Sequence, residues 1–258
     1  MNEIVIDDII DISLNAAVLV MENGGETYRA EETCVLIAKS LGAYDVSAFV
    51  SPTVVIVTVT DQNNKTHTAM KRIKNRAVNL ENISQLNNFS RQLTNQGKST
   101  NPYEAKELLT KIKNSPGHSK ISLLLMAGFS AFFFCFMFGG NLKESIIAFF
   151  IGIILRFELI ILDRFNLNGF ILSVINGVVI STLCALVIVI GFAPATITVM
   201  TAVLMQVVPG MAIVNAIRDF IAGDLLAGTV RLVEAFMVAA GLSVGSACGV
   251  LLFSHVVG

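Results

Sequence analysis

An apolar stretch near the C-terminal end of the chain carries a helix breaker together with charged and amide side chains. Residues 207–224, VVPGMAIVNAIRDFIAGD, contain Pro209 and Gly210, and proline breaks a helix because it lacks a backbone donor and clashes with the preceding turn. Broken helices are tolerated at membrane depth only against protein or water, and transporters use them to expose helix ends to a substrate. The stretch therefore predicts a substrate or coupling pathway, with a plain kinked loop as the alternative.

The charged and amide side chains of this pathway come from several predicted membrane helices. Asn215 and Asp219 are four residues apart and share a helix face. Arg156 and Glu158 are two apart and point to different faces, so each is expected to find a partner elsewhere or to extend towards the membrane interface. The full set of expected pathway residues is Arg156, Glu158, Asn176, Pro209, Gly210, Asn215, Arg218, Asp219, Asp224 and Arg231.

Asp219 has two possible roles. A carboxylate does not attract an anionic substrate, so Asp219 either pairs with a cation or carries the coupling proton. The candidate cations are Arg231, Arg156 and Arg218 of a neighbouring copy. Asp219 and Asn215 are expected to line the cytoplasmic approach to the pathway.

Five apolar segments must position these side chains. Each is close to the roughly 20 residues that a membrane span needs; they lie at about 121–138, 145–162, 170–192, 195–214 and 229–257. Basic residues near the ends of the segments fall mainly on the side of the N-terminus, which predicts a cytoplasmic N-terminus and an external C-terminus. The fifth segment carries a ridge of small residues suited to close helix packing, with a partner subunit or another copy as the expected neighbour: Gly241, Gly245 and Gly249.

The first part of the chain has the pattern of a small α+β domain. Helices are expected at 4–21, 28–41, 77–96 and 102–113, and two or three strands between the second and third helix, with a hairpin near 61–66. The predicted fold is therefore a cytoplasmic α+β domain, 1–117, followed by a membrane helical bundle of five helices, 118–258.

Composition excludes several classes of protein. The chain is 54% hydrophobic, and 26 of its 37 Lys, Arg, Asp and Glu residues lie in residues 1–120, in equal numbers of each sign. This balance argues against nucleic-acid binding. Four scattered cysteines indicate neither a disulfide framework nor a metal site, and no cofactor is expected. The acidic N-terminus lacks the basic region of a signal peptide.

Enzyme activity has little support in the sequence. There is no GxxxxGK[ST] loop, so ATP hydrolysis by that route is not expected. His255 with Ser243 or Ser246 could suggest a nucleophile pair, but His255 lies at the end of its segment.

Two motifs resemble the bacterial threonine/serine exporter family. The first is GxETxRxExT, from Gly24 to Thr33, and the second is PGx4NAxRDx3GDx3Gx2Rx2EA, from Pro209 to Ala235. The resemblance covers nearly the whole chain. Long members of that family carry about ten spans, so a chain with five resembles the split type, in which a long subunit works with a separate short membrane subunit.

The resemblance implies a subunit of a secondary exporter in the inner membrane, which also forms homo-oligomers. Its expected substrates are small carboxylate-bearing metabolites, either threonine and serine or a dicarboxylate such as succinate, and export is expected to be proton-driven. The alternative is a membrane-anchored metabolite sensor or an assembly subunit without transport of its own.

Overall fold

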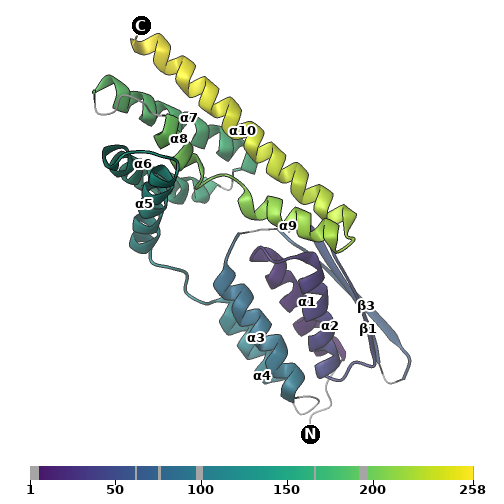
Figure 1. The fold of residues 1–258 in the computed structure, drawn as a ribbon. Coiled ribbons are helices and arrows are strands. Elements are labelled where there is room, and N and C mark those ends of the chain that lie inside the picture. The colour runs from purple at the N-terminus through teal and green to yellow at the C-terminus, as the bar shows by residue number, and fades with distance from the viewer. Residues whose placement is uncertain are drawn as a thin grey trace. The chain divides into compact units, whose positions relative to one another are not determined.

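The computed structural model describes residues 6–61, 63–74, 77–96, 101–165, 167–191 and 197–257, and the chain forms two compact units (Figure 1). Unit 1 comprises Met1–Pro116 and Met211–Leu232, and unit 2 comprises Gly117–Gly210 and Val233–Gly258. The division therefore departs from the two consecutive domains expected from the sequence, because 211–232 folds with the N-terminal part of the chain.

Unit 1 has three layers. A three-stranded antiparallel sheet of order β1-β2-β3 forms one layer, α1 and α2 pack on one of its faces, and α3 and α4 cover these helices. The elements are α1 (Ile6–Glu22), α2 (Thr27–Ser40), β1 (Asp45–Val50), β2 (Val54–Thr60), β3 (Thr66–Arg72), α3 (Leu80–Gln96) and α4 (Pro102–Lys113).

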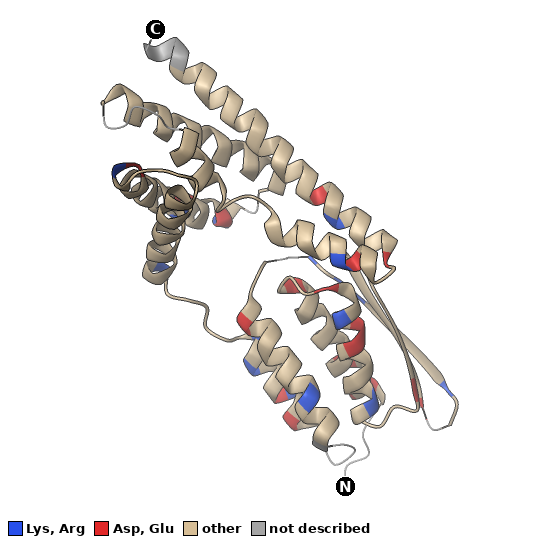
Figure 2. Cartoon of the chain, in the orientation of Figure 1, with Lys and Arg blue, Asp and Glu red and all other residues tan. Residues whose placement is uncertain are grey.

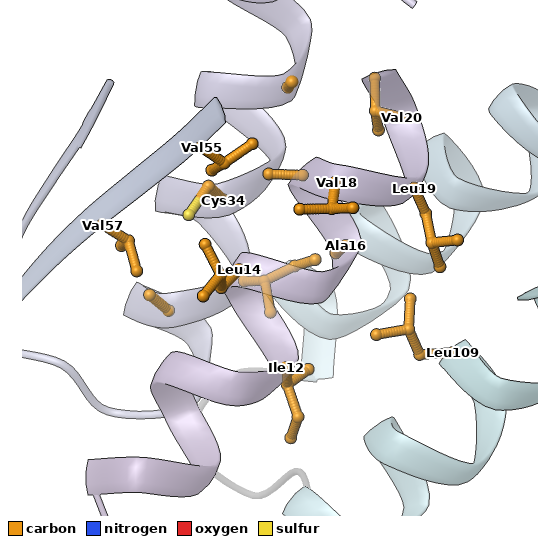
Figure 3. Packing of buried hydrophobic residues seen from close by; sticks show 14 of the residues in the cluster. Ile12, Leu14, Ala16, Val18, Leu19, Val20, Cys34, Val55, Val57 and Leu109 are labelled. Carbon is orange, nitrogen blue, oxygen red and sulfur yellow. The ribbon is translucent and has the colours of Figure 1, made fainter. Parts of the chain in front are cut away.

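The middle layer supplies much of the core. In Figure 3, Cys34 of α2 lies against Val55 and Val57 of β2, and Leu19 of α1 lies beside Leu109 of α4. Because α1 packs against the sheet on one side and α4 on the other, it is buried over more of its surface than the amphipathic pattern of its sequence suggests.

The predicted elements of unit 1 are confirmed within a few residues, apart from one boundary. The third helix begins at Leu80 instead of 77, because the N–H groups of Ala77 and Asn79 donate to the carbonyls of Glu22 and Asn23. These bonds hold 77–79 against the end of α1. Residues 4, 5, 62, 75 and 76 lie outside the described residues.

Unit 2 is a helical bundle. Its elements are α5 (Lys120–Met137), α6 (Leu142–Leu162), the short 3-10 helix η2 (Asp163–Phe165), α7 (Gly169–Val189), α8 (Ile197–Leu204) and the part of α10 (Leu225–Val257) from Val233 on. Figure 2 shows that charged residues gather on unit 1, whereas α7 carries none. Large apolar side chains such as Phe129, Phe133 and Phe136 of α5 are exposed, as expected of lipid-facing positions.

The described residues contain four helices long and apolar enough to cross a membrane, not five. They are Lys120–Met137, Leu142–Phe165, Gly169–Val189 and Leu225–Phe253. The expected span at 195–214 is not a single helix. It consists of α8, which has eight residues, a turn, and the start of α9 (Gly210–Ile221), while 195 and 196 lie outside the described residues. An eight-residue helix is about 12 Å long, well short of a hydrocarbon core of about 30 Å.

The glycine ridge of α10 packs against α7 of the same chain. A Cβ on Gly241 would lie 2.9 Å from the carbonyl oxygen of Phe170, and one on Gly249 would lie 2.8 Å from that of Val178. On α7, a Cβ on Gly177 would lie 2.5 Å from the carbonyl oxygen of Leu242. The expectation that a partner subunit or another copy occupies this ridge is therefore wrong, because α7 occupies it.

The close approach of α7 and α10 predicts that Gly245→Ala destabilises unit 2. A Cβ at Gly245 would lie within 3 Å of the Val174 backbone, which cannot move aside without shifting α7. We expect a loss of roughly 1–3 kcal/mol, the usual cost of overpacking, seen as a lower melting temperature of the purified chain in detergent. Gly169→Ala is the matched control, because its Cβ would meet no atom within 4 Å. Equal melting temperatures would contradict the α7–α10 packing.

Candidate functional site

The predicted helix break separates α8 from α9. Helix α8 ends at Leu204, and α9 begins at Gly210, directly after Pro209. Between them, the N–H groups of Val207 and Val208 both donate to the carbonyl of Leu204, at 3.0 Å, which closes the end of α8 with tight turns. Because of this break, α9 is a separate helix, and from Met211 on it belongs to unit 1.

The polar face of α9 packs against the turn between α1 and α2. Asn215, 2% exposed, donates from Nδ2 to the carbonyl of Gly24 at 2.8 Å. The two glycines of this turn are required by its geometry. Gly24 has a φ of +86°, and a Cβ on Gly25 would lie 2.9 Å from the carbonyl oxygen of Val20.

Asp219 accepts hydrogen bonds at the start of α2. Its Oδ1 lies 2.7 Å from Oγ1 of Thr27 and 3.3 Å from the Thr27 backbone nitrogen. Glu26, the N-cap residue of α2, makes no side-chain cap of its own. Asp219 therefore supplies a capping carboxylate from a residue far away in sequence, at the end of a helix where a negative charge is stabilised.

Arg231 of α10 completes this arrangement. Its Nε lies 2.9 Å from Oδ2 of Asp219, and its NH2 group donates to the carbonyl of Gly25 at 2.7 Å. The same NH2 group lies 3.8 Å from the sulfur of Met21 at the end of α1. Asp219 is fully buried and Arg231 is 6% exposed. We call Asp219, Arg231, Asn215 and the Gly24–Thr27 turn the Asp219 cluster.

A second ion pair lies at the edge of the Asp219 cluster. Arg218 of α9 pairs with Glu26, which also lies 3.7 Å from Arg29. Burial alone would raise the pKa of Glu26, but hydrogen bonds from its own backbone N–H and from Arg218, with the charge of Arg29, hold that pKa below its ordinary value. Glu26 stabilises the cluster while it is ionised, and this contribution is lost as the pH falls through the lowered pKa.

Asp224 lies in the turn between α9 and α10. Its Oδ1 accepts from the N–H of Ala227 at 3.0 Å and so caps α10, after Gly223 has reversed the chain with a φ of +87°. Burial and the nearby carboxylate of Asp224 raise the pKa of Glu31, although the Val50 N–H that Glu31 accepts opposes the shift. Arg231, seven residues after Asp224, pairs with Asp219.

Residues of the two motifs thus meet in one place. Gly24, Glu26 and Thr27 of the first motif contact Asn215, Arg218 and Asp219 of the second. Asn215 and Asp219 are buried against the α1–α2 turn, so they do not line an open approach as the sequence led us to expect. The spacing of four residues correctly placed them on one face, but the sequence held no signal for what that face contacts.

Unit 2 holds a different set of polar groups, with buried atoms that have no hydrogen-bond partner among the described residues. Both carboxylate oxygens of Glu158 on α6 are buried without a hydrogen bond to any described residue, and so is the Oδ1 of Asn176 on α7. No ion pair joins Arg156 to Glu158 in the described part of the chain. Buried polar atoms without partners cost free energy, so these positions are where a ligand, water or another subunit is expected to bind.

Gln206 was missed by the sequence analysis. It follows α8, and its Nε2 is buried without a partner among the described residues. Its side chain packs over Gly152 of α6, where a Cβ would lie 2.5 Å from Nε2. The available signal was an amide three residues before Pro209 in an otherwise apolar run.

The Asp219–Arg231 pair predicts a strongly coupled stability effect. Asp219→Asn keeps the size of the side chain but leaves the buried guanidinium of Arg231 without its counter-charge. We expect the single variant to lose about 3–5 kcal/mol, measured as reduced thermal stability of the whole chain in detergent. Asp219→Asn with Arg231→Met should recover part of the loss, because no buried charge then lacks a partner. The control, Lys111→Gln, removes an ion pair with Glu107 in which the two side chains are 68% and 54% exposed, and we expect a small effect. A fully stable Asp219→Asn variant would show that the pair contributes nothing.

Comparison with known proteins gives the chain a family. A family model described as "Putative threonine/serine exporter" matches residues 11–253. A protein of Klebsiella aerogenes, described as "Probable succinate transporter subunit YjjP", is 20% identical over 242 residues, which cover 93% of this chain and 91% of that protein. No solved structure matches the chain. With the match covering almost all of both units, the chain belongs to the threonine/serine exporter family of membrane exporters.

Proposed function

We propose that this chain is the long subunit of a two-subunit exporter in the inner membrane, which moves small carboxylate-bearing metabolites outward on the proton gradient. The family match over residues 11–253 is the observation that carries the proposal. Threonine, serine and succinate, named in the descriptions of the family and of the relative, share a carboxylate on a small polar skeleton. The substrate class that we propose is therefore threonine and serine or a small dicarboxylate.

The broken segment between α7 and α9 supports a transport role. Helix α8 packs in the core of unit 2, with Val199, Ala202 and Val203 buried among residues of α5, α6 and α7. Non-helical backbone at membrane depth is tolerated only where it is buried in protein or lines a water-filled cavity, and broken helices of this kind form binding sites in transporters. We place the permeation path in unit 2, beside Gln206 and Asn176.

We further propose that Glu158 carries the coupling proton. Asp219 is ion-paired with Arg231, whereas neither carboxylate oxygen of Glu158 has a partner among the described residues. An unpaired ionised carboxylate on a membrane helix is costly, so the side chain gains by taking up a proton when no cation is present. A carboxyl group that binds and releases a proton as its surroundings change is what proton coupling requires.

A sensor remains the second candidate function. Unit 1 has a cleft of about 340 Å³ between α1, β3 and α4, lined by side chains of both charges, including Asp11, Glu22, Lys71, Lys106 and Lys113. Its size and mixed charge suit a small zwitterion or anion. In the sensor reading, the membrane helices serve assembly and the chain supports no flux.

A flux assay tests the exporter. The chain, reconstituted into vesicles with a short membrane subunit of the same family, should move labelled succinate, threonine or serine when a proton gradient is imposed. We expect no flux from the chain alone, because it carries half the spans of long family members. An absence of flux for all three substrates with both subunits present would favour the sensor.

Glu158→Gln separates coupling from binding in the same vesicles. The amide cannot carry a proton, so gradient-driven export should be lost while exchange of substrate for substrate, which needs no net proton movement, continues. Asp219→Asn is the comparison variant. Export by the part of the Asp219→Asn protein that still assembles should depend on the proton gradient. If Glu158→Gln still exports at the normal rate, Glu158 is not the coupling group.

The membrane topology follows from the same proposal. Within unit 1, α9 packs with the N-terminal part of the chain through Asn215 and Asp219, so the two lie on the same side of the membrane. We propose five crossings in all, one more than the four spanning helices of the described residues, with the C-terminus on the side opposite the N-terminus. We propose a cytoplasmic N-terminus, which agrees with the distribution of Lys and Arg. A C-terminal reporter fusion should be accessible only from outside the cell; access only from the cytoplasm would contradict five crossings.

A further inference from the structure

Helix α9 exposes an apolar face. Ile213, Ile217 and Ile221 follow one another at intervals of four residues, so they form a row along the helix, and they are 37%, 51% and 82% exposed. Val214, 42% exposed, lies beside this row. We call these four side chains the isoleucine face.

The opposite side of α9 is the buried one, and it is polar. Asn215 and Asp219 are 2% and 0% exposed, because they belong to the Asp219 cluster. A surface helix of a water-soluble domain normally buries its apolar stripe and exposes its polar residues. Helix α9 instead buries its polar residues and exposes its apolar ones, so contact of its exposed surface with water is unfavourable.

The neighbouring sequence indicates what covers the isoleucine face. Helix α10, which begins at Leu225, four residues after Ile221, belongs to a candidate membrane span, and Leu225 and Leu226 at its start are also exposed. Only Leu225–Leu232, about 12 Å of helix, separate the start of α10 from its part in unit 2, so α9 lies near the surface of the bilayer. With 12 residues, α9 is about 18 Å long and cannot cross the bilayer itself.

We infer that α9 is an interfacial helix, which lies in the plane of the membrane with its isoleucine face among the lipid acyl chains near the headgroups. Helices with one apolar face and one polar face bind membranes in this way, with the apolar side buried by about 5–10 Å. In this protein the polar face of α9 does not depend on lipid headgroups, because Asn215 and Asp219 form hydrogen bonds with the α1–α2 turn. Lipid is favoured over a protein partner because the face is aliphatic and carries no aromatic or arginine anchor of the kind that dominates protein interfaces.

Spin-label accessibility tests this inference on the full chain. Ile213→Cys, Ile217→Cys and Ile221→Cys are each labelled in a background carrying Cys248→Ser, because Cys248 is the exposed native cysteine among the four. The proteins are reconstituted into vesicles of phosphatidylethanolamine and phosphatidylglycerol. Met70→Cys, at a 73% exposed position of β3 in the same unit, is the matched control for a site facing water.

Collision rates with oxygen and with a water-soluble nickel chelate then distinguish the possible surroundings. At all three isoleucine positions we expect oxygen collisions to exceed nickel collisions several-fold, with the opposite ratio at Met70. Nickel-dominated collisions at the isoleucines, as at Met70, would overturn the inference by placing the face in water. Immobile labels accessible to neither reagent would overturn it by placing the face against protein, either another copy or a membrane helix. Unchanged melting temperatures of the labelled variants confirm that folding is intact.

Discussion

The buried ion pair between Asp219 and Arg231 is the interaction on which the organisation of unit 1 depends. The carboxylate also accepts from Thr27, and the guanidinium also donates to the Gly25 carbonyl, so both ions have hydrogen-bond partners as well as each other. A buried pair is stabilising only under such conditions, because each ion loses its hydration. The pair joins the end of α1, the start of α2, α9 and the start of α10, which lie about 200 residues apart in the chain.

This pair also explains why charged residues are tolerated at the start of α10, a helix long enough to cross a membrane. Arg231 lies within the apolar segment that begins at Leu225, where an unpaired charge would be costly. Leu225–Leu232 pack with unit 1 instead, and Arg231 finds its counter-charge there. From Val233 to Phe253 the helix is still about 30 Å long, enough for the hydrocarbon core without the arginine.

The sequence was sufficient for most of the elements but not for their contacts. Periodicity and turn residues located the helices and strands of unit 1, since Asn101 with Pro102 and the hairpin near Asp61 are local signals. The association of 211–232 with the N-terminal part could not be predicted, because hydrogen bonds between residues about 190 apart leave no periodicity. The short α8 was also missed: hydropathy averages over a window, and an apolar run broken by turns scores like a span.

The residues that we propose for transport are distinct from most residues of the two motifs. Most polar residues of the second motif have their hydrogen bonds satisfied within unit 1, and a satisfied buried group has little left to offer a substrate. Among the described residues, Glu158, Asn176 and Gln206 have buried polar atoms without a hydrogen-bond partner, and they lie outside both motifs, on or beside membrane helices. In the second motif, Oδ1 of Asn215 also lacks a partner there. The residues of the two motifs are those that the fold of unit 1 requires. Buried polar atoms without partners in an apolar unit indicate instead where a ligand or a proton can bind. We therefore propose that export depends on Glu158, Asn176 and Gln206, whereas the motif residues hold α9 and the start of α10 against the α1–α2 turn.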